Sequence, residues 1–103
     1  MSLMVDRQET CWVFRVEGDF NMTASAELKG LLLEGLASGK ELHLDLERAA
    51  EIDITLLQLV WSAEREAARV GSLFVSRVSE TAARLAREAG LPSFPGTAQA
   101  LEG

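Results

Sequence analysis

The sequence predicts a single α/β domain in which helices pack on a mixed β-sheet, with the element order β-β-α-β-α-β-α. Two observations lead to this fold class. Segments in which apolar and polar residues alternate are interspersed with longer segments whose apolar residues recur every three or four positions, and these are the periods of strands and helices. Glycines and prolines fall between the segments, where the chain has to turn. A length of 103 residues fits one such domain.

The start of the chain predicts an antiparallel hairpin. Residues 10–17 are rich in aromatic and β-branched side chains and predict a strand. Residues 3–7 are expected to pair with it through a turn near residues 8–9. Gly18 and Asp19 then interrupt the pattern. The side chains expected together on one face of the longer strand are those of Trp12, Phe14 and Val16.

The rest of the chain predicts alternating helices and strands. A first helix over residues 23–37 is followed by a strand over 41–46, whose three leucines share one face. A second helix over 55–70 leads to a short strand over 72–76, and these two strands are expected to be parallel because a helix crosses between them. Residues 79–89 predict a third helix, closed by a glycine. The expected core includes Leu28, Leu32, Leu44, Leu46, Leu56, Leu59, Val60, Ala63 and Ala67.

We expect the folded domain to span residues 4–92, with an irregular tail over 93–103. The outermost residues of both ends are consistent with cloning remnants.

The composition limits the classes of partner. Net charge is −6 with only two lysines, which disfavours nucleic acid and anionic lipid surfaces. No apolar run approaches the roughly 20 residues that span a bilayer, and no secretory signal opens the chain. The single cysteine cannot form an internal disulfide, so we expect a reducing, cytoplasmic location.

No group of residues predicts an enzyme, a metal site or a cofactor site. His43 is the only histidine, and His43 with Asp45 supplies two ligands where a catalytic zinc site needs three. Cys11 lies within a predicted strand, where a small core filler is expected. Residues 35–40 superficially resemble a phosphate loop, but they run from helix to strand and lack the required hydroxyl residue after the lysine. We therefore predict a protein without catalytic residues.

The segment before the second helix has a purely structural interpretation. Thr55 precedes Gln58 by three residues, the spacing of a capping box at a helix start. Asp53 lies just before the same helix, where the helix dipole favours a carboxylate. Both residues can thus be explained as helix starters.

The chain also resembles the STAS domain family, the anti-sigma factor antagonists and their relatives, over about residues 5–92. Residues 18–21 resemble the family's Gly-x-Leu-Asp helix opening. Residues 44–46 followed by 52–59 resemble its strand and Asp-Ser-Ser-Gly-Leu loop, and Gly71 and residues 89–91 match its recurrent helix endings. The resemblance implies a STAS-like domain that binds a protein partner, in signal transduction and transcription regulation.

In family members that antagonise anti-sigma factors, the partner kinase phosphorylates the second serine of that loop. The matching position is Thr55, and the resemblance implies that Asp53 supports the loop. The sequence departs from the pattern at Ile54 and Leu56, and the bulk of Leu56 is expected to narrow access to the hydroxyl. The implied partner is an anti-sigma, serine/threonine-kinase-type ATPase. The alternative is an accessory STAS subunit that binds the ATPase of a lipid-transport ABC complex.

Trp61 completes the predicted binding surface. It follows Leu57 by one helical turn at the edge of the buried stripe. A large aromatic residue in such a place acts as an interface anchor, or it packs against the third helix, and the sequence leaves both readings open. The residues expected to contact the partner are Asp53, Ile54, Thr55, Leu57 and Trp61.

Overall fold

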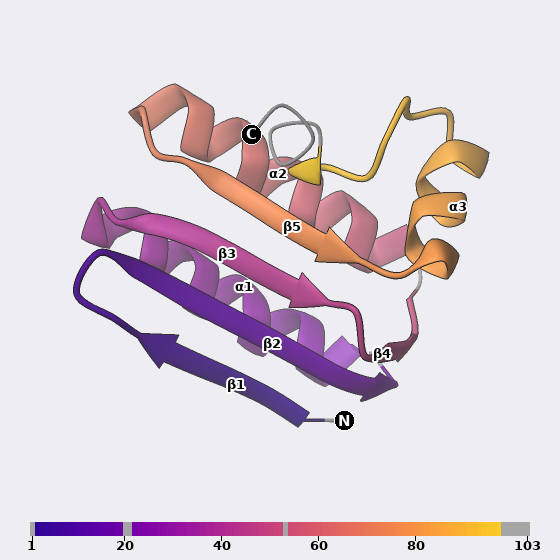
Figure 1. Ribbon diagram of the computed structural model, residues 1–103, viewed down its shortest axis with the longest axis horizontal. Helices are drawn as coiled ribbons and strands as arrows, with labels where there is room; N and C mark the ends of the chain where they lie inside the picture. Colours follow the sequence, from indigo (N-terminus) through magenta and orange to yellow (C-terminus); the bar gives the residue numbers. More distant parts are fainter. Residues whose placement is uncertain (1, 20–21, 53, 98–103) are drawn as a thin grey trace.

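The computed structural model describes residues 2–19, 22–52 and 54–97, and it has the predicted α/β architecture (Figure 1). One short strand, Ala49–Glu51, is present in addition to the predicted elements, between the strand Glu41–Leu46 and the second helix. The elements are β1 (Ser2–Arg7), β2 (Cys11–Asp19), α1 (Met22–Ser38), β3 (Glu41–Leu46), β4 (Ala49–Glu51), α2 (Ile54–Val70), β5 (Phe74–Val78) and α3 (Glu80–Glu88).

The sheet is mixed, as the sequence predicts. Its strand order is β1-β2-β3-β5, with β4 paired to the end of β2. Strands β1 and β2 form the antiparallel hairpin, in a register that places Val5 opposite Phe14. The other pairings, β2 with β3, β3 with β5 and β2 with β4, are parallel. The predicted parallel arrangement of β3 and β5 is thereby confirmed.

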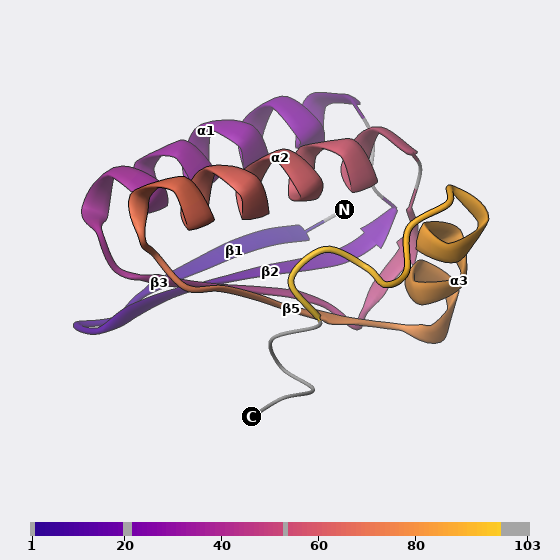
Figure 2. The ribbon, with the colours of Figure 1, turned by 90° about the horizontal axis from the view of Figure 1, so that it is seen from above.

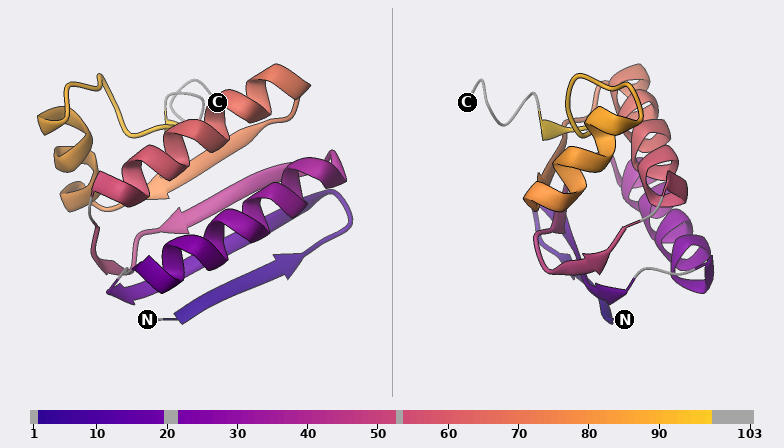
Figure 3. Two further views of the ribbon diagram at one scale, coloured as in Figure 1. Left: turned by 180° about the vertical axis from the view of Figure 1, so that it is seen from behind. Right: turned by 90° about the vertical axis from the view of Figure 1, so that its right-hand side faces the viewer.

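Two helices cover only one face of this sheet. Helices α1 and α2 lie side by side above it, whereas α3 sits at the end of the sheet where β5 finishes (Figures 2 and 3). The alternation of β3 points its three leucines toward the helices and leaves His43 and Asp45 on the uncovered face. Burying these apolar side chains is the main favourable contribution to folding. The largest buried side chains include Phe14, Leu28, Leu32, Leu42, Leu44, Leu46, Leu56, Val60, Phe74 and Phe94.

Three sequence predictions need correction. Strand β5 begins at Phe74, two residues later than predicted, and Leu73 is 40% exposed. Leu59 is only partly buried, and Leu57 takes its place in the buried stripe of α2. Strand β4 was not predicted, because a three-residue segment containing Ala49 is too short to show an alternating pattern.

The segment after α3 is irregular but tightly packed. Phe94 is 1% exposed and belongs to the core. Gly96 donates its backbone N–H to the carboxylate of Glu64 on α2, and its carbonyl accepts the Ser76 N–H of β5 at 3.4 Å. Thr97 donates its backbone N–H to the Phe94 carbonyl at 3.1 Å. Residues 93–97 therefore cover the outer edge of β5, although they form no strand.

Candidate partner-docking surface

Helix α2 positions most of the residues that the sequence singled out. It begins at Ile54, so Thr55 lies inside the first turn and not in front of it. The predicted capping box of Thr55 and Gln58 requires Thr55 to precede the helix and is therefore wrong. Asp53, the predicted supporting carboxylate, lies outside the described residues.

The first turn of α2 separates its residues into a buried and an exposed set. Leu56 and Leu57 are 0% and 2% exposed and anchor the turn on the sheet. Ile54 is 48% exposed, and Thr55 is exposed as well. Because Leu56 points into the core, it does not cover Thr55, contrary to the expectation that its bulk narrows access to the hydroxyl. Leu57, although buried, lies next to the exposed Ile54.

Trp61 lies almost two turns further along α2. Its side chain is 41% exposed, and the Arg65 guanidinium lies over the ring, 4.7 Å from the ring centre. A cation above an indole is attracted by the negative face of the ring, an interaction of about 0.5–1 kcal/mol at an exposed site. The stacked arginine favours one orientation of the indole, which leaves a large apolar surface in contact with water.

A shallow groove of about 240 Å³ runs beside these residues, between α2 and the end of α3. On the α3 side, Gly90 has φ +92°, a conformation that favours glycine. The Gly90 N–H donates to the Arg87 carbonyl and the Leu91 N–H donates to the Ala86 carbonyl, both at 3.0 Å. This helix ending turns Leu91 back toward α2. The groove is lined by Ile54, Leu57, Gln58, Trp61, Ala89 and Leu91.

Thr55 is exposed next to this groove but does not line it. Successive residues of an α-helix are turned by about 100°, so Thr55 and Trp61 point about 120° apart around the axis of α2. They are also about 9 Å apart along that axis. A partner that contacts both side chains has to wrap around roughly a third of the helix.

Glu66 and Arg69 form an ion pair on the outer face of α2. The Arg69 Nε donates to both carboxylate oxygens of Glu66 at 3.1 Å. This hydrogen bond lowers the pKa of Glu66 and raises the pKa of Arg69. The pair is solvent-exposed and contributes little to stability. Since the folded pKa of Glu66 is depressed, that contribution is present above the ordinary carboxyl pKa and is lost as pH falls through the folded value.

The other candidates from the sequence lie on the uncovered face of the sheet. His43 Nε2 is 3.5 Å from the carboxylate of Glu41, and Cys11 and Asp45 line a depression on the same face. Within residues 2–19, 22–52 and 54–97, no group of three histidine, cysteine or acidic residues could hold a metal ion. No helix in the same part of the chain is long and apolar enough to cross a membrane.

Sequence reasoning missed the contribution of α3 to the groove. Gly90 and Pro92 signalled where this helix ends, but not that the ending brings Ala89 and Leu91 against α2. The approach of two helix ends is a tertiary property, and no local pattern in either segment encodes it. The apolar character of Leu91 directly after a helix-ending glycine is the one available signal.

Comparisons with known proteins agree with this architecture. A family model described as "Mlab, STAS domain" matches residues 3–95. A comparison with curated protein sequences found no match. The Bacillus cell fate determinant SpoIIAA in its phosphorylated form aligns with 98% of this chain and 97% of its own, at 17% identity and a TM-score of 0.76.

Two further solved structures are similar. An anti-sigma factor antagonist from Mycobacterium paratuberculosis aligns with 98% of this chain and 91% of its own, at 18% identity and a TM-score of 0.72. SpoIIAA in its unphosphorylated form aligns with 73% of this chain and 71% of its own, at 17% identity and a TM-score of 0.66. At these identities the likeness shows a common fold.

Proposed function

Because the chain belongs to the STAS domain family, we propose that this regulatory protein docks onto a serine/threonine-kinase-type ATPase and is released when Thr55 is phosphorylated. One observation carries the proposal: an exposed threonine lies in the first turn of α2, beside an apolar groove with exposed Ile54 and Trp61. Docking and phosphorylation take place in the cytoplasm, where ATP is available. The protein itself supplies no catalytic residue.

The chemical step needs only an accessible hydroxyl on this chain. The Thr55 oxygen attacks the γ-phosphorus of ATP, and a new oxygen–phosphorus bond forms as the bond to the β-phosphate oxygen breaks. ADP leaves, and the hydroxyl proton passes to a base on the partner. The exposure of Thr55 and the burial of Leu56 support such an attack, because the bulky Leu56 side chain lies in the core and not over Thr55.

The phosphate would act through its charge. It adds about −2 at the start of a helix, where the exposed N–H groups and the dipole tolerate an anion. The fold of this chain is therefore expected to stay unchanged. A partner surface that is acidic, or that packs tightly on the first turn of α2, would be repelled. Release would then follow from electrostatics and desolvation alone.

The solved neighbours support this proposal over the accessory-subunit alternative. Two of them are anti-sigma factor antagonists, and SpoIIAA is known in both a phosphorylated and an unphosphorylated form. The threonine of this chain would take the place of the modified residue in such a cycle. No described residue specifically favours binding to the ATPase of a lipid-transport complex.

The test begins with the purified chain as bait for its cognate ATPase and continues with phosphoryl transfer from γ-labelled ATP. Thr23 and Thr81 are matched controls, because each is exposed and is the second residue of its helix, as Thr55 is in α2. We expect Thr55→Ala to abolish labelling, and Thr23→Ala and Thr81→Ala to leave it unchanged. Thr55→Ala should still dock, whereas Thr55→Glu should dock more weakly, although one carboxylate imitates a phosphate dianion poorly.

Persistent labelling of Thr55→Ala would refute the phosphorylation site. Equal binding of Thr55→Glu and the parent protein would refute the charge mechanism. Capture of an ABC-type ATPase that transfers no phosphate would instead support the accessory-subunit alternative.

A further inference from the structure

Strand β1 leaves one edge of the sheet open. Gln8 donates its N–H to the Cys11 carbonyl at 2.9 Å, so these two residues form a hydrogen-bonded pair next to the hairpin turn. Such pairs alternate with non-hydrogen-bonded pairs along an antiparallel ladder. The backbone N–H and C=O groups of Leu3, Val5 and Arg7 therefore point away from β2. No backbone group within the described residues pairs with them.

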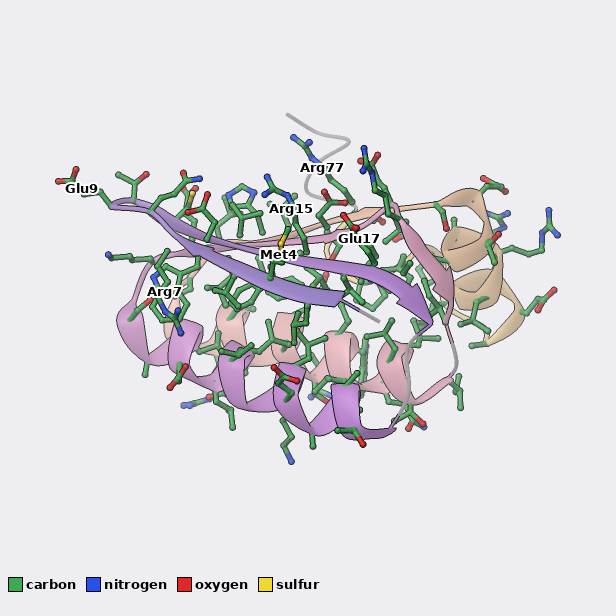
Figure 4. The ribbon with its side chains drawn as sticks, turned by 90° about the horizontal axis from the view of Figure 1, so that it is seen from below. Met4, Arg7, Glu9, Arg15, Glu17 and Arg77 are labelled. Carbon is green, nitrogen blue, oxygen red and sulfur yellow. The ribbon has the colours of Figure 1, made fainter. Side chains whose placement is uncertain are left out.

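This edge lacks the usual protection against pairing. Edge strands are normally blocked by proline, by bulges or by central charges. Strand β1 contains no proline, and its pairing with β2 runs without a shift in register. Its charged residues, Asp6 and Arg7, lie together at one end. Figure 4 looks onto this edge, with Met4 rising from the uncovered face and Arg7 pointing toward the helices.

The apolar side chains lie on both faces of the strand. Met4 is 49% exposed on the uncovered face. Leu3 and Val5 are partly buried on the helix side, where they pack against the core. The opposite charges of Asp6 and Arg7 cancel. The edge is thus neutral and apolar, in a chain whose net charge is −6.

We propose that a second copy of this chain pairs with β1 across a two-fold axis at Met4, which joins the two sheets into one. In an antiparallel pair, residues opposite each other share a face, and closed two-fold contacts use the same surface twice. Met4 then meets Met4 of the second copy, and Leu3 meets Val5. Each Leu3–Val5 pair exchanges both of its backbone hydrogen bonds, because these residues carry the outward-pointing groups.

This register separates apolar from charged residues better than the next one. An axis at Val5 would also keep the faces aligned, but it would place Arg7 opposite Leu3 and Asp6 opposite Met4. With the axis at Met4, the charged residues move to the two ends of the paired strands. A foreign strand could use the same backbone groups, but only a second copy is certain to match the pattern of the edge in this way.

The interface is small. Pairing through one strand falls at the low end of interface sizes, below about 1,200 Å², so we expect a weak, reversible dimer. Sedimentation equilibrium of the full chain from about 1 to 500 µM should show the mass rise from 11.2 kDa toward twice that value. A chain that stays monomeric over the whole range overturns the proposal.

Two variants locate the interface. Met4 is opposite Arg15 of β2, so the fold should tolerate Met4→Glu. In the dimer, however, this variant would bring two carboxylates together across the two-fold axis. We expect at least a tenfold weaker dimer. Leu33→Glu on α1 is the matched control, because Leu33 is 55% exposed and the charge change is the same. Circular dichroism confirms that both variants are folded. If Leu33→Glu alone weakens the dimer, the contact lies on the helices and the proposal is wrong.

Cross-linking tests the register directly. In a Cys11→Ser background, Met4→Cys would place two cysteines in a non-hydrogen-bonded pair with Cα atoms about 4.5 Å apart, which suits a disulfide. Asp6→Cys in the same background would place them about 13 Å apart, too far to bridge. Mild oxidation should therefore link the first variant and not the second. Faster linking of the Asp6→Cys variant would overturn the proposed pairing.

Discussion

Replacing Gly96 by alanine should destabilise the protein by about 2–5 kcal/mol. The backbone there has φ +90°, a conformation that costs an L-residue about 1–2 kcal/mol. An added Cβ would also lie 2.7 Å from the Ser76 Oγ, 3.0 Å from the Ser76 backbone nitrogen and 3.1 Å from a ring carbon of Phe74. Such overpacking costs about 1–3 kcal/mol. The loss is large for a domain whose total stability is expected to be about 5–15 kcal/mol.

Urea unfolding followed by circular dichroism measures this loss, and Gly90→Ala separates its two causes. Gly90 has nearly the same φ, +92°, but an added Cβ would meet no atom within 4 Å. We expect that variant to lose only the conformational part, about 1–2 kcal/mol. If both variants lose the same amount to within about 0.5 kcal/mol, residues 93–97 do not pack on β5 as described.

Two further substitutions test the start of α2 and its aromatic anchor. Thr55→Ala should change the free energy of unfolding by less than about 0.5 kcal/mol, as is usual for an exposed residue that caps no helix. Ser79→Ala should cost about 1 kcal/mol, because the Ser79 hydroxyl accepts the Ala82 N–H at the start of α3. A cost of about 1 kcal/mol for Thr55→Ala in the same urea assay would instead support the capping box. Trp61→Ala should weaken partner binding about 30-fold in a calorimetric titration. The control is Val70→Ala, at a similarly exposed residue that ends α2, and it should bind like the parent protein.

Most of the fold could be predicted from the sequence because its strands alternate cleanly. The three leucines of β3 and the pair Phe14 and Val16 of β2 are buried as their spacing predicts. The alternation of β5 is obscured, because the inward position between Phe74 and Val78 is held by Ser76, a polar residue that is 2% exposed. The start of that strand was therefore placed two residues too early, at Ser72 and Leu73.

The phase of α2 was harder to predict for a different reason. Leu56, Leu57, Leu59 and Val60 are all apolar, so a period of 3.6 residues fits more than one buried stripe. Packing on the sheet selects Leu57 and leaves Leu59 in the groove between α1 and α2. The direction of Thr55 relative to Trp61 does not depend on that phase, because a spacing of six residues places the two side chains about 120° apart on any α-helix.

The two proposed surfaces lie at opposite sides of the molecule, and this has a consequence for binding. Strand β1 is at one end of the strand order, whereas helices α2 and α3, which form the groove, both contact β5 at the other end (Figure 1). Pairing through β1 would therefore leave both grooves open, one on each copy. A partner that is itself dimeric could then engage two grooves at once and gain avidity of about a hundredfold without any new contact. Phosphorylation of one Thr55 would weaken only half of that attachment, so release would require both copies to be modified.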